Sequence, residues 1–224
     1  MPGRIEPLVT NEIYHVFNLG VAHCSTFIDK RDYQRFIELI NFYQFPNPPM
    51  RFSHFLLLSN ERRSNFIMEV SKKDQKLIKL INYCLMPNHF HFLLQQTYDG
   101  GISKFLANLQ NSYTKYFNVK QSRIGSLFLD QFKAIRIETE EQLIHVSRYI
   151  HLNPYTGFVV KNLEELEKYP WFSFNESSLL NGNICQKESV LSLFKNPEYY
   201  KQFVFDQAGY QRELGIIKHL LMER

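Results

Sequence analysis

The sequence contains few of the cysteines that hold small secreted folds together. Its 224 residues include only Cys24, Cys84 and Cys185, which are widely separated and form no C-x-x-C pair. An odd, scattered set of thiols argues against a disulfide framework and against a thiolate zinc site. We therefore expect a protein of a reducing compartment, and the cytoplasm fits best.

Long apolar runs and a strong excess of one charge are also lacking. Runs such as FLLL at 55–58 fall far short of the roughly 20 residues that span a bilayer. The first ten residues contain no apolar core of a signal peptide, so we expect neither secretion nor a membrane span. The net charge of +4 is compatible with a phosphate-rich partner but is also common in other proteins.

Aromatic residues, by contrast, are abundant. The chain contains 20 Phe and 13 Tyr, and hydrophobic residues make up 44% of it. Disordered chains have few aromatics and low hydrophobicity. A chain of this length can also bury a sizeable core without disulfides or metals. The composition therefore predicts a stably folded protein.

The order of the local patterns predicts an α/β sandwich. Strands are indicated by period-two or β-rich patterns and helices by apolar residues at helical spacing. In chain order we predict a strand at 12–19, a helix at 30–45, strands at 76–86 and 89–96, a helix at 102–117, a strand at 132–138 and a helix at 139–153. The first six elements follow the β-α-β-β-α-β order of a ferredoxin-like fold with an antiparallel sheet, and the last is an added helix.

Prolines and capping residues suggest where elements begin and end. PNPP at 46–49 ends the first helix and opens an insertion at 46–75, which we interpret as helical and peripheral. Thr139 and Gln142 form a capping-box pattern that opens the last helix of the sandwich. Pro154 is expected to end that helix.

The pattern of the sequence after residue 175 predicts a C-terminal helical appendage. We divide the sequence into a main domain at 1–175 and a C-terminal helical appendage at 176–224. The stretch from Pro197 to Arg224 has the pattern of one amphipathic helix, which must bury its apolar face on something. Docking on the main domain is one alternative, and gripping nucleic acid or a second subunit is the other.

His89 and His91 are the first candidates for chemistry. Residues two apart on a strand face the same way, so both imidazoles can reach one metal ion. Phe90 and Phe92 then face a core on the other side. Taken alone, the spacing favours the alternative of ordinary strand histidines.

Tyr149 and Asn153 form the second pair, because residues four apart lie on one helix face. The alternative is a packing tyrosine and a helix-ending asparagine. Together with the histidines, however, they offer two neutral imidazoles and an amide oxygen, an incomplete shell open to water and phosphate. With a pKa near 10, a phenol needs about 4 kcal/mol to ionise at neutral pH, which a nearby cation would lower. A phosphotyrosine bond is reversible, which suits cutting and rejoining of strands.

Four segments resemble, in this order, the REP-associated tyrosine transposases and the wider single-tyrosine HUH transposases: YHVFN at 14–18, YCLMPNHFHFLL at 83–94, LFLDQFK at 127–133 and RYIHLNP at 148–154. The resemblance covers roughly residues 10–175, and the combination of MPNHFHFLL with YIHLNP is highly specific. It implies that His89 and His91 bind Mg²⁺ or Mn²⁺, that Tyr149 attacks single-stranded DNA, and that Asn153 occupies the third ligand position. The domain at 1–175 would then be the catalytic one.

The sequence departs from this family at two basic positions. Members usually have arginine after the asparagine of the first strand, where this chain has Leu19. They often have arginine before the Phe-Lys pair, where this chain has Gln131. Both changes remove a group that could contact phosphate.

Further residues are candidate DNA contacts: His15, Lys115, Arg123, Lys133, Arg136, His145 and Arg148. Each basic side chain could equally be a solvated surface charge. His145 lies one turn before the predicted nucleophile, and His15 lies on the strand expected beside the histidine pair. Tyr113, Tyr116 and Phe117 could stack bases, with core packing as the alternative.

These patterns lead to one functional prediction. We expect a metal-dependent single-strand DNA endonuclease and strand transferase that acts on hairpin DNA through a 5′-phosphotyrosine, as a monomer or a homodimer. A domesticated, non-cleaving nucleic-acid-binding protein is the first alternative. A hydrolytic metallo-phosphoesterase that uses only the histidine pair is the second, and it leaves the helix motif unexplained.

Overall fold

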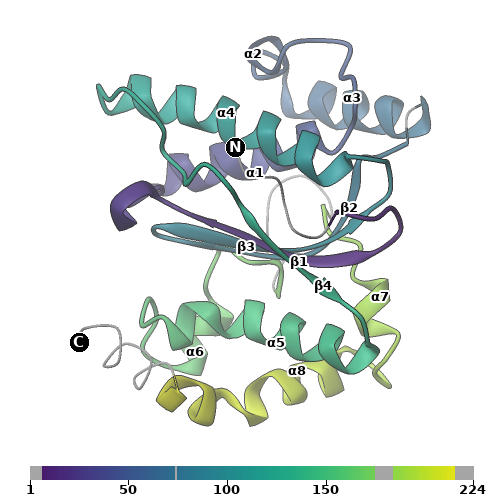
Figure 1. Cartoon of the computed structure of the whole chain (residues 1–224), viewed down its shortest axis with the longest axis vertical. Coiled ribbons are helices and arrows are strands. Elements are labelled where there is room, and N and C mark those ends of the chain that lie inside the picture. The colour runs from purple at the N-terminus through teal and green to yellow at the C-terminus, as the bar shows by residue number, and fades with distance from the viewer. Residues whose placement is uncertain (1–6, 74, 175–183, 215–224) are drawn as a thin grey trace.

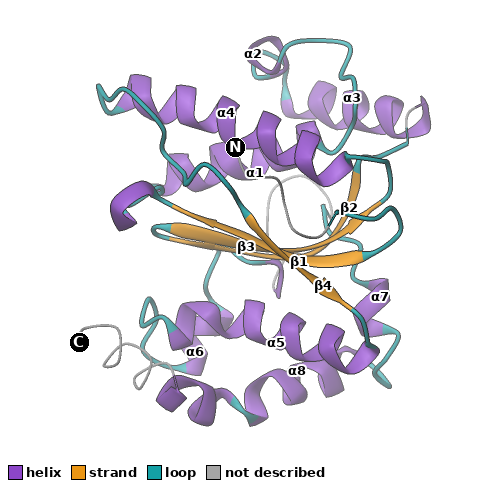
Figure 2. Cartoon of the chain, in the orientation of Figure 1, coloured by secondary structure: helices purple, strands orange, loops and turns teal. Residues whose placement is uncertain are grey.

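The structure, a computed structural model, describes residues 7–73, 75–174 and 184–214. Its centre is an open sheet with helices on both faces (Figures 1 and 2). The strands are β1 (Ile13–Leu19), β2 (Ile78–Met86), β3 (His89–Gln96) and β4 (Lys133–Ile137), in the order β2-β3-β1-β4 with every neighbouring pair antiparallel. This confirms the predicted ferredoxin-like sandwich.

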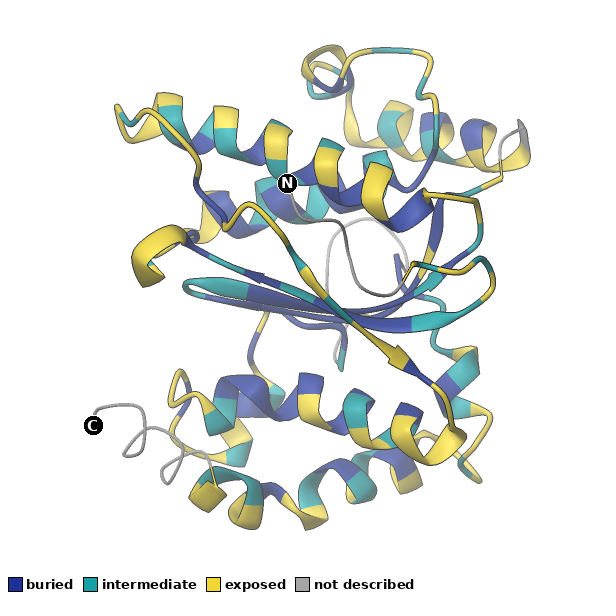
Figure 3. Ribbon diagram, viewed as in Figure 1, coloured by how far each residue is buried: buried dark blue, intermediate teal, exposed yellow. Residues whose placement is uncertain are grey.

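One face of the sheet is covered by α1 (Lys30–Tyr43) and α4 (Gly101–Lys120) (Figure 1). The predicted insertion forms α2 (Phe52–Phe55) and α3 (Asn60–Lys73), which lie at the outer side of this layer. Phenylalanines from the sheet and from all these helices join one buried cluster, so the insertion extends the core (Figure 3).

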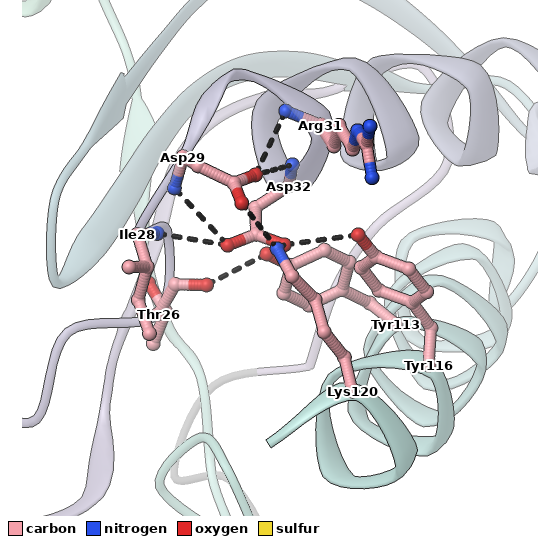
Figure 4. A network of polar contacts seen from close by, with 8 residues as sticks. All are labelled: Thr26, Ile28, Asp29, Arg31, Asp32, Tyr113, Tyr116 and Lys120. Carbon is pink, nitrogen blue, oxygen red and sulfur yellow. Dashed lines mark hydrogen bonds and ion pairs between the residues drawn. The ribbon is translucent and has the colours of Figure 1, made fainter.

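A polar network joins α1 to α4 within this layer (Figure 4). The Asp29 side chain caps α1, and the fully buried Asp32 accepts hydrogen bonds from the main-chain N–H groups of Ile28 and Asp29, just before the helix. From α4, Lys120 forms ion pairs with Asp29 (2.8 Å) and Asp32 (2.5 Å), and Tyr116 donates to Asp32. The neighbouring Tyr113 is buried and donates to a main-chain oxygen, so the core-packing alternative holds for it.

The other face carries α5 (Glu140–Thr156), with α6 (Leu163–Glu167), α7 (Glu188–Leu191) and α8 (Pro197–Asp206) arranged around it (Figure 1). A short 3₁₀ turn, Val21–His23, follows β1. Apolar residues of α5, α8 and this face of the sheet form a second buried cluster. Among the described residues, no helix is both long and apolar enough to cross a membrane.

Two predicted boundaries are wrong. Thr139 caps α5 as expected, but the helix continues through Pro154 to Thr156, because a proline removes only its own N–H donor. The predicted C-terminal helix from Pro197 is interrupted at Gln207, and residues 208–214 are helical again. Its part beyond 214 lies outside the described residues, and the domain division near 176 stays a prediction.

Candidate active site on the sheet face

The two strand histidines face α5. In the β1–β3 pairing, His91 lies opposite Phe17 and His89 lies opposite Leu19. Side chains directly opposite one another on antiparallel strands share a face. Phe90 and Phe92 point the other way and are fully buried in the first core, as predicted.

Each of these histidines is held through its Nδ1 atom. His91 Nδ1 lies 3.0 Å from Nε2 of His15, and His89 Nδ1 lies 2.6 Å from Oδ1 of Asn88. A histidine whose one ring nitrogen is oriented by a hydrogen bond presents the other in a fixed direction. The Nε2 atoms of His89 and His91 are therefore the ones available to a ligand.

All three imidazoles of the site are held neutral. Burial lowers the pKa of His15 and of His89 to about 4, and the charge of His23 contributes at His89. Burial, together with the other two rings, holds the pKa of His91 well below its usual range. A neutral imidazole is the form that binds metal ions.

Tyr149 lies over the histidines from α5. Its ring centroid is 5.6 Å from that of His91 and 5.8 Å from that of His15, and the residue remains 41% exposed. Burial of the phenol raises its pKa, an effect that a hydrogen bond with Asn153 partly offsets. The hydroxyl is therefore protonated at neutral pH, and nucleophilic use of it needs a group that favours the phenolate.

Asn153 lies one turn further along the same helix and is buried. Its Nδ2 atom donates to the main-chain oxygen of Tyr149 at 3.0 Å, so Oδ1 is the end of the amide that is left for another partner. The candidate donor set is thus two imidazole nitrogens and one amide oxygen. Among the described residues, no three His, Cys, Asp or Glu side chains gather to hold an ion.

Of the candidate DNA contacts, the structure brings His15 and Lys133 to this face. His15 contacts both His91 and Tyr149. Lys133 lies opposite Phe17 in the β1–β4 pairing and is exposed, with Nζ 5.9 Å from the centre of that ring.

Three others are engaged within the protein. Arg136 lies on the opposite face of β4 and forms an ion pair with Glu12 at 2.9 Å. His145 bonds to Arg148 at 2.6 Å, and Arg148 is buried, with its guanidinium 4.2 Å from the centre of the Phe203 ring on α8. This placement argues against a phosphate contact by Arg148.

The remaining two candidates, Lys115 and Arg123, lie in or next to the helical layer on the other face of the sheet. Lys115 is exposed on α4, which covers the face of the sheet away from Tyr149 (Figure 1). Arg123 follows α4 and bonds to Asn118 and to the main-chain oxygen of Ser126. The structure does not bring either residue to the histidine pair.

Sequence patterns missed a buried network that ties α5 to α8. The Tyr200 hydroxyl of α8 lies 2.5 Å from Oγ of Ser147 and 2.7 Å from Nδ1 of His151. Asn82 of β2 donates to Ser147, and the other nitrogen of His151 lies 2.8 Å from Ser173 Oγ. Ser147 and His151 lie two residues before and two residues after Tyr149 on α5. Only long-range packing creates this network, so no local pattern signals it.

Replacing Tyr200 with phenylalanine should loosen this attachment. The change removes the hydroxyl that bonds to both Ser147 and His151, so each loses one buried hydrogen bond while Ser147 keeps Asn82 and His151 keeps Ser173. We therefore expect the free energy of unfolding to fall by about 1–3 kcal/mol. Amide hydrogens of α5 should exchange faster. Urea denaturation and hydrogen exchange measure both effects. Tyr199→Phe is the matched control, because its side chain is 48% exposed. If both variants had the same free energy of unfolding and the same amide exchange in α5, the network would not be what attaches α5 to α8.

Comparisons with known proteins bear on the family and the fold. Residues 53–153, which contain both histidines, Tyr149 and Asn153, match the model of the family described as IS200-like transposases. The fold is similar to a solved REP-associated tyrosine transposase bound to a REP hairpin, with a TM-score of 0.53 and 13% identity, covering 83% of this chain and 94% of that one. No curated protein sequence matches. The central segment of the chain thus matches the IS200-like transposase family, and the fold is similar to that of a REP-associated tyrosine transposase.

Proposed function

We propose that the chain is a single-strand DNA endonuclease and strand transferase with Tyr149 as its nucleophile. The observation that carries the proposal is the partly exposed phenol packed against the neutral pair His15 and His91, with Asn153 beside it. The transposase family match supports strand transfer as the reaction class. The hairpin bound by the structural neighbour supports hairpin DNA as the substrate.

The chemistry requires only the exchange of phosphate esters. The Oη atom of Tyr149 attacks a backbone phosphorus, the phenol loses its proton, and the bond from phosphorus to the 3′ oxygen breaks. The upstream strand leaves as a 3′-hydroxyl, and the downstream strand stays on the enzyme as a 5′-phosphotyrosine. A 3′-hydroxyl of another strand reverses the step, so joining needs no external energy source.

The donor set fits a divalent cation that the substrate helps to neutralise. His89 and His91 would bind Mg²⁺ or Mn²⁺ through Nε2 and Asn153 through Oδ1, with phosphate and water oxygens completing the shell. When bound, the cation supplies positive charge that stabilises the phenolate and the reacting phosphate. His15 fixes the orientation of His91 by the hydrogen bond between their rings.

A non-cleaving DNA-binding protein is the competing function. It is favoured by the absence of basic groups at Leu19 and Gln131 and by the engagement of Arg136 and Arg148 within the protein. These features lower the positive charge available to DNA. The loss of these basic groups does not explain why the neutral rings of His15 and His91 lie against an accessible phenol. Cleavage is therefore the function we propose.

End-labelled hairpin DNA separates the two functions. Incubation with Mn²⁺ and denaturing electrophoresis should show the 3′ label migrating with the protein and the 5′ label in a shorter strand ending in a 3′-hydroxyl. Chelation of the metal should abolish both products. Binding without either product would support the non-cleaving protein, and cleavage without attached label would support a hydrolytic phosphoesterase.

A further inference from the structure

We propose that the sheet corner beside Tyr149 is a platform for an unpaired DNA base, on which the base stacks against Phe17 while Lys133 contacts a neighbouring phosphate. This inference rests on the proposed function in one respect, namely that the ligand is single-stranded DNA. It assigns a binding role to residues that the catalytic proposal does not use.

The corner is open because α5 crosses the sheet obliquely. Near its start, Leu143 shares a buried cluster with Ile137 at the end of β4. At its other end, Gly157 lies against Met86 of β2, so closely that a Cβ atom there would be 2.7 Å from the methionine methyl carbon. The other part of β4 is left uncovered, and Ile135 is 58% exposed (Figure 3).

The side chains of this corner share one face with the site. Phe17 lies opposite Lys133 on one side and opposite His91 on the other, and His15 lies opposite Ile135. The Phe17 ring is 5.0 Å from the ring of His15 and 5.5 Å from that of His91. The rings of His15 and His91 thus contact both Phe17 and Tyr149, which places the platform beside the proposed nucleophile.

The chemistry of the corner suits an unpaired nucleotide. A base offers a flat apolar face, which stacks on an aromatic ring regardless of sequence. In a duplex that face is covered by neighbouring bases, so a stacking ring selects unpaired strands. Lys133 supplies a positive charge next to the ring, and among the described residues no carboxylate forms an ion pair with it.

Alternative occupants fit less well. The apolar part of the corner consists of Phe17 and Ile135, far too little for a stable protein interface, which buries on the order of 800 Å² on each partner. The α4 aromatics that could have stacked bases are largely committed elsewhere, because Tyr113 and Phe117 are buried in the first core. Phe17, by contrast, remains partly open to solvent and contacts both histidine rings that lie against Tyr149.

Binding of a 12-residue oligothymidine with one 2-aminopurine tests the platform without any cleavage. In EDTA buffer, we expect Phe17→Ala to weaken binding by about tenfold, as loss of one stacked base predicts, and to reduce the quenching of 2-aminopurine fluorescence. Phe17→Trp should retain both, and it also guards against misfolding of the alanine variant. Val119→Ala is the matched control, since this side chain is 84% exposed on α4.

The outcomes separate the platform from the nuclease. Wild-type affinity in a folded Phe17→Ala protein, or an equal loss in Val119→Ala, would overturn the platform. A tenfold loss that Phe17→Trp restores would establish it, even if no phosphotyrosine ever forms on Tyr149. Formation of the adduct with no effect of Phe17→Ala would leave the proposed function standing and remove the platform.

Discussion

Replacing Tyr149 with phenylalanine should reduce the covalent DNA adduct to background while leaving folding and hairpin binding nearly unchanged. Only one hydroxyl is lost, from a residue that is 41% exposed, so the free energy of unfolding should change by less than about 1 kcal/mol. Electrophoresis of 3′-labelled hairpin with Mn²⁺ measures the adduct, and anisotropy measures binding.

Tyr155 provides the control from the same helix. Its ring packs under the guanidinium of Arg212, a contact that phenylalanine preserves, and its hydroxyl is not required by the mechanism. Tyr155→Phe should therefore form the adduct at the wild-type rate. An adduct that persists in Tyr149→Phe would show that the nucleophile is a different group.

Replacing His91 with alanine should lower the affinity for Mn²⁺ by more than about 100-fold and remove cleavage with it. Loss of a supporting hydrogen bond alone costs 10- to 100-fold in metal sites, and here a ligand itself is lost. Calorimetry and the electron paramagnetic resonance of free Mn²⁺ follow the affinity directly. His91→Asn keeps a polar group in the buried position if the alanine variant does not fold.

The same measurement has a control and a pH dependence. His54, exposed on α2, should be replaceable by alanine without effect on Mn²⁺ affinity. Because burial lowers the pKa of His89 to about 4, protons should not compete with the metal until the pH falls below about 5. Unchanged Mn²⁺ binding in a folded His91→Ala protein would exclude this site.

The order and type of the sandwich elements could be predicted from the sequence because their patterns are local and strong. The alternation around His89 and His91 places both histidines on one face wherever the strand lies. The wrong prediction of one uninterrupted helix from Pro197 also rests on a local pattern. Tyr200, Val204 and Ala208 are all buried at a spacing of four, and this spacing continues across the break at Gln207. An apolar period therefore cannot reveal the interruption.

The site is predictable only to the extent that its residues are close in the sequence. Tyr149 and Asn153 pair within one helix, and the structure brings Tyr149 to His91. The burial of Arg148 depends on α8, more than fifty residues later in the chain. Phe17 lies two residues after His15 on β1, and this spacing could have indicated that the two side chains share a face. The exposure of Phe17, however, depends on the path of α5.

The attachment of α5 to α8 has a consequence for synthesis of the protein. The four strands, the site histidines and Tyr149 are synthesised before Tyr200, because they precede it in the chain. Until α8 emerges, Ser147 and His151 lack the hydroxyl that bonds to both of them. A nascent or prematurely terminated chain would thus carry the whole set of reactive groups on a loosely held helix. Under the proposed function, we expect adduct formation on Tyr149 to require a chain that extends through α8.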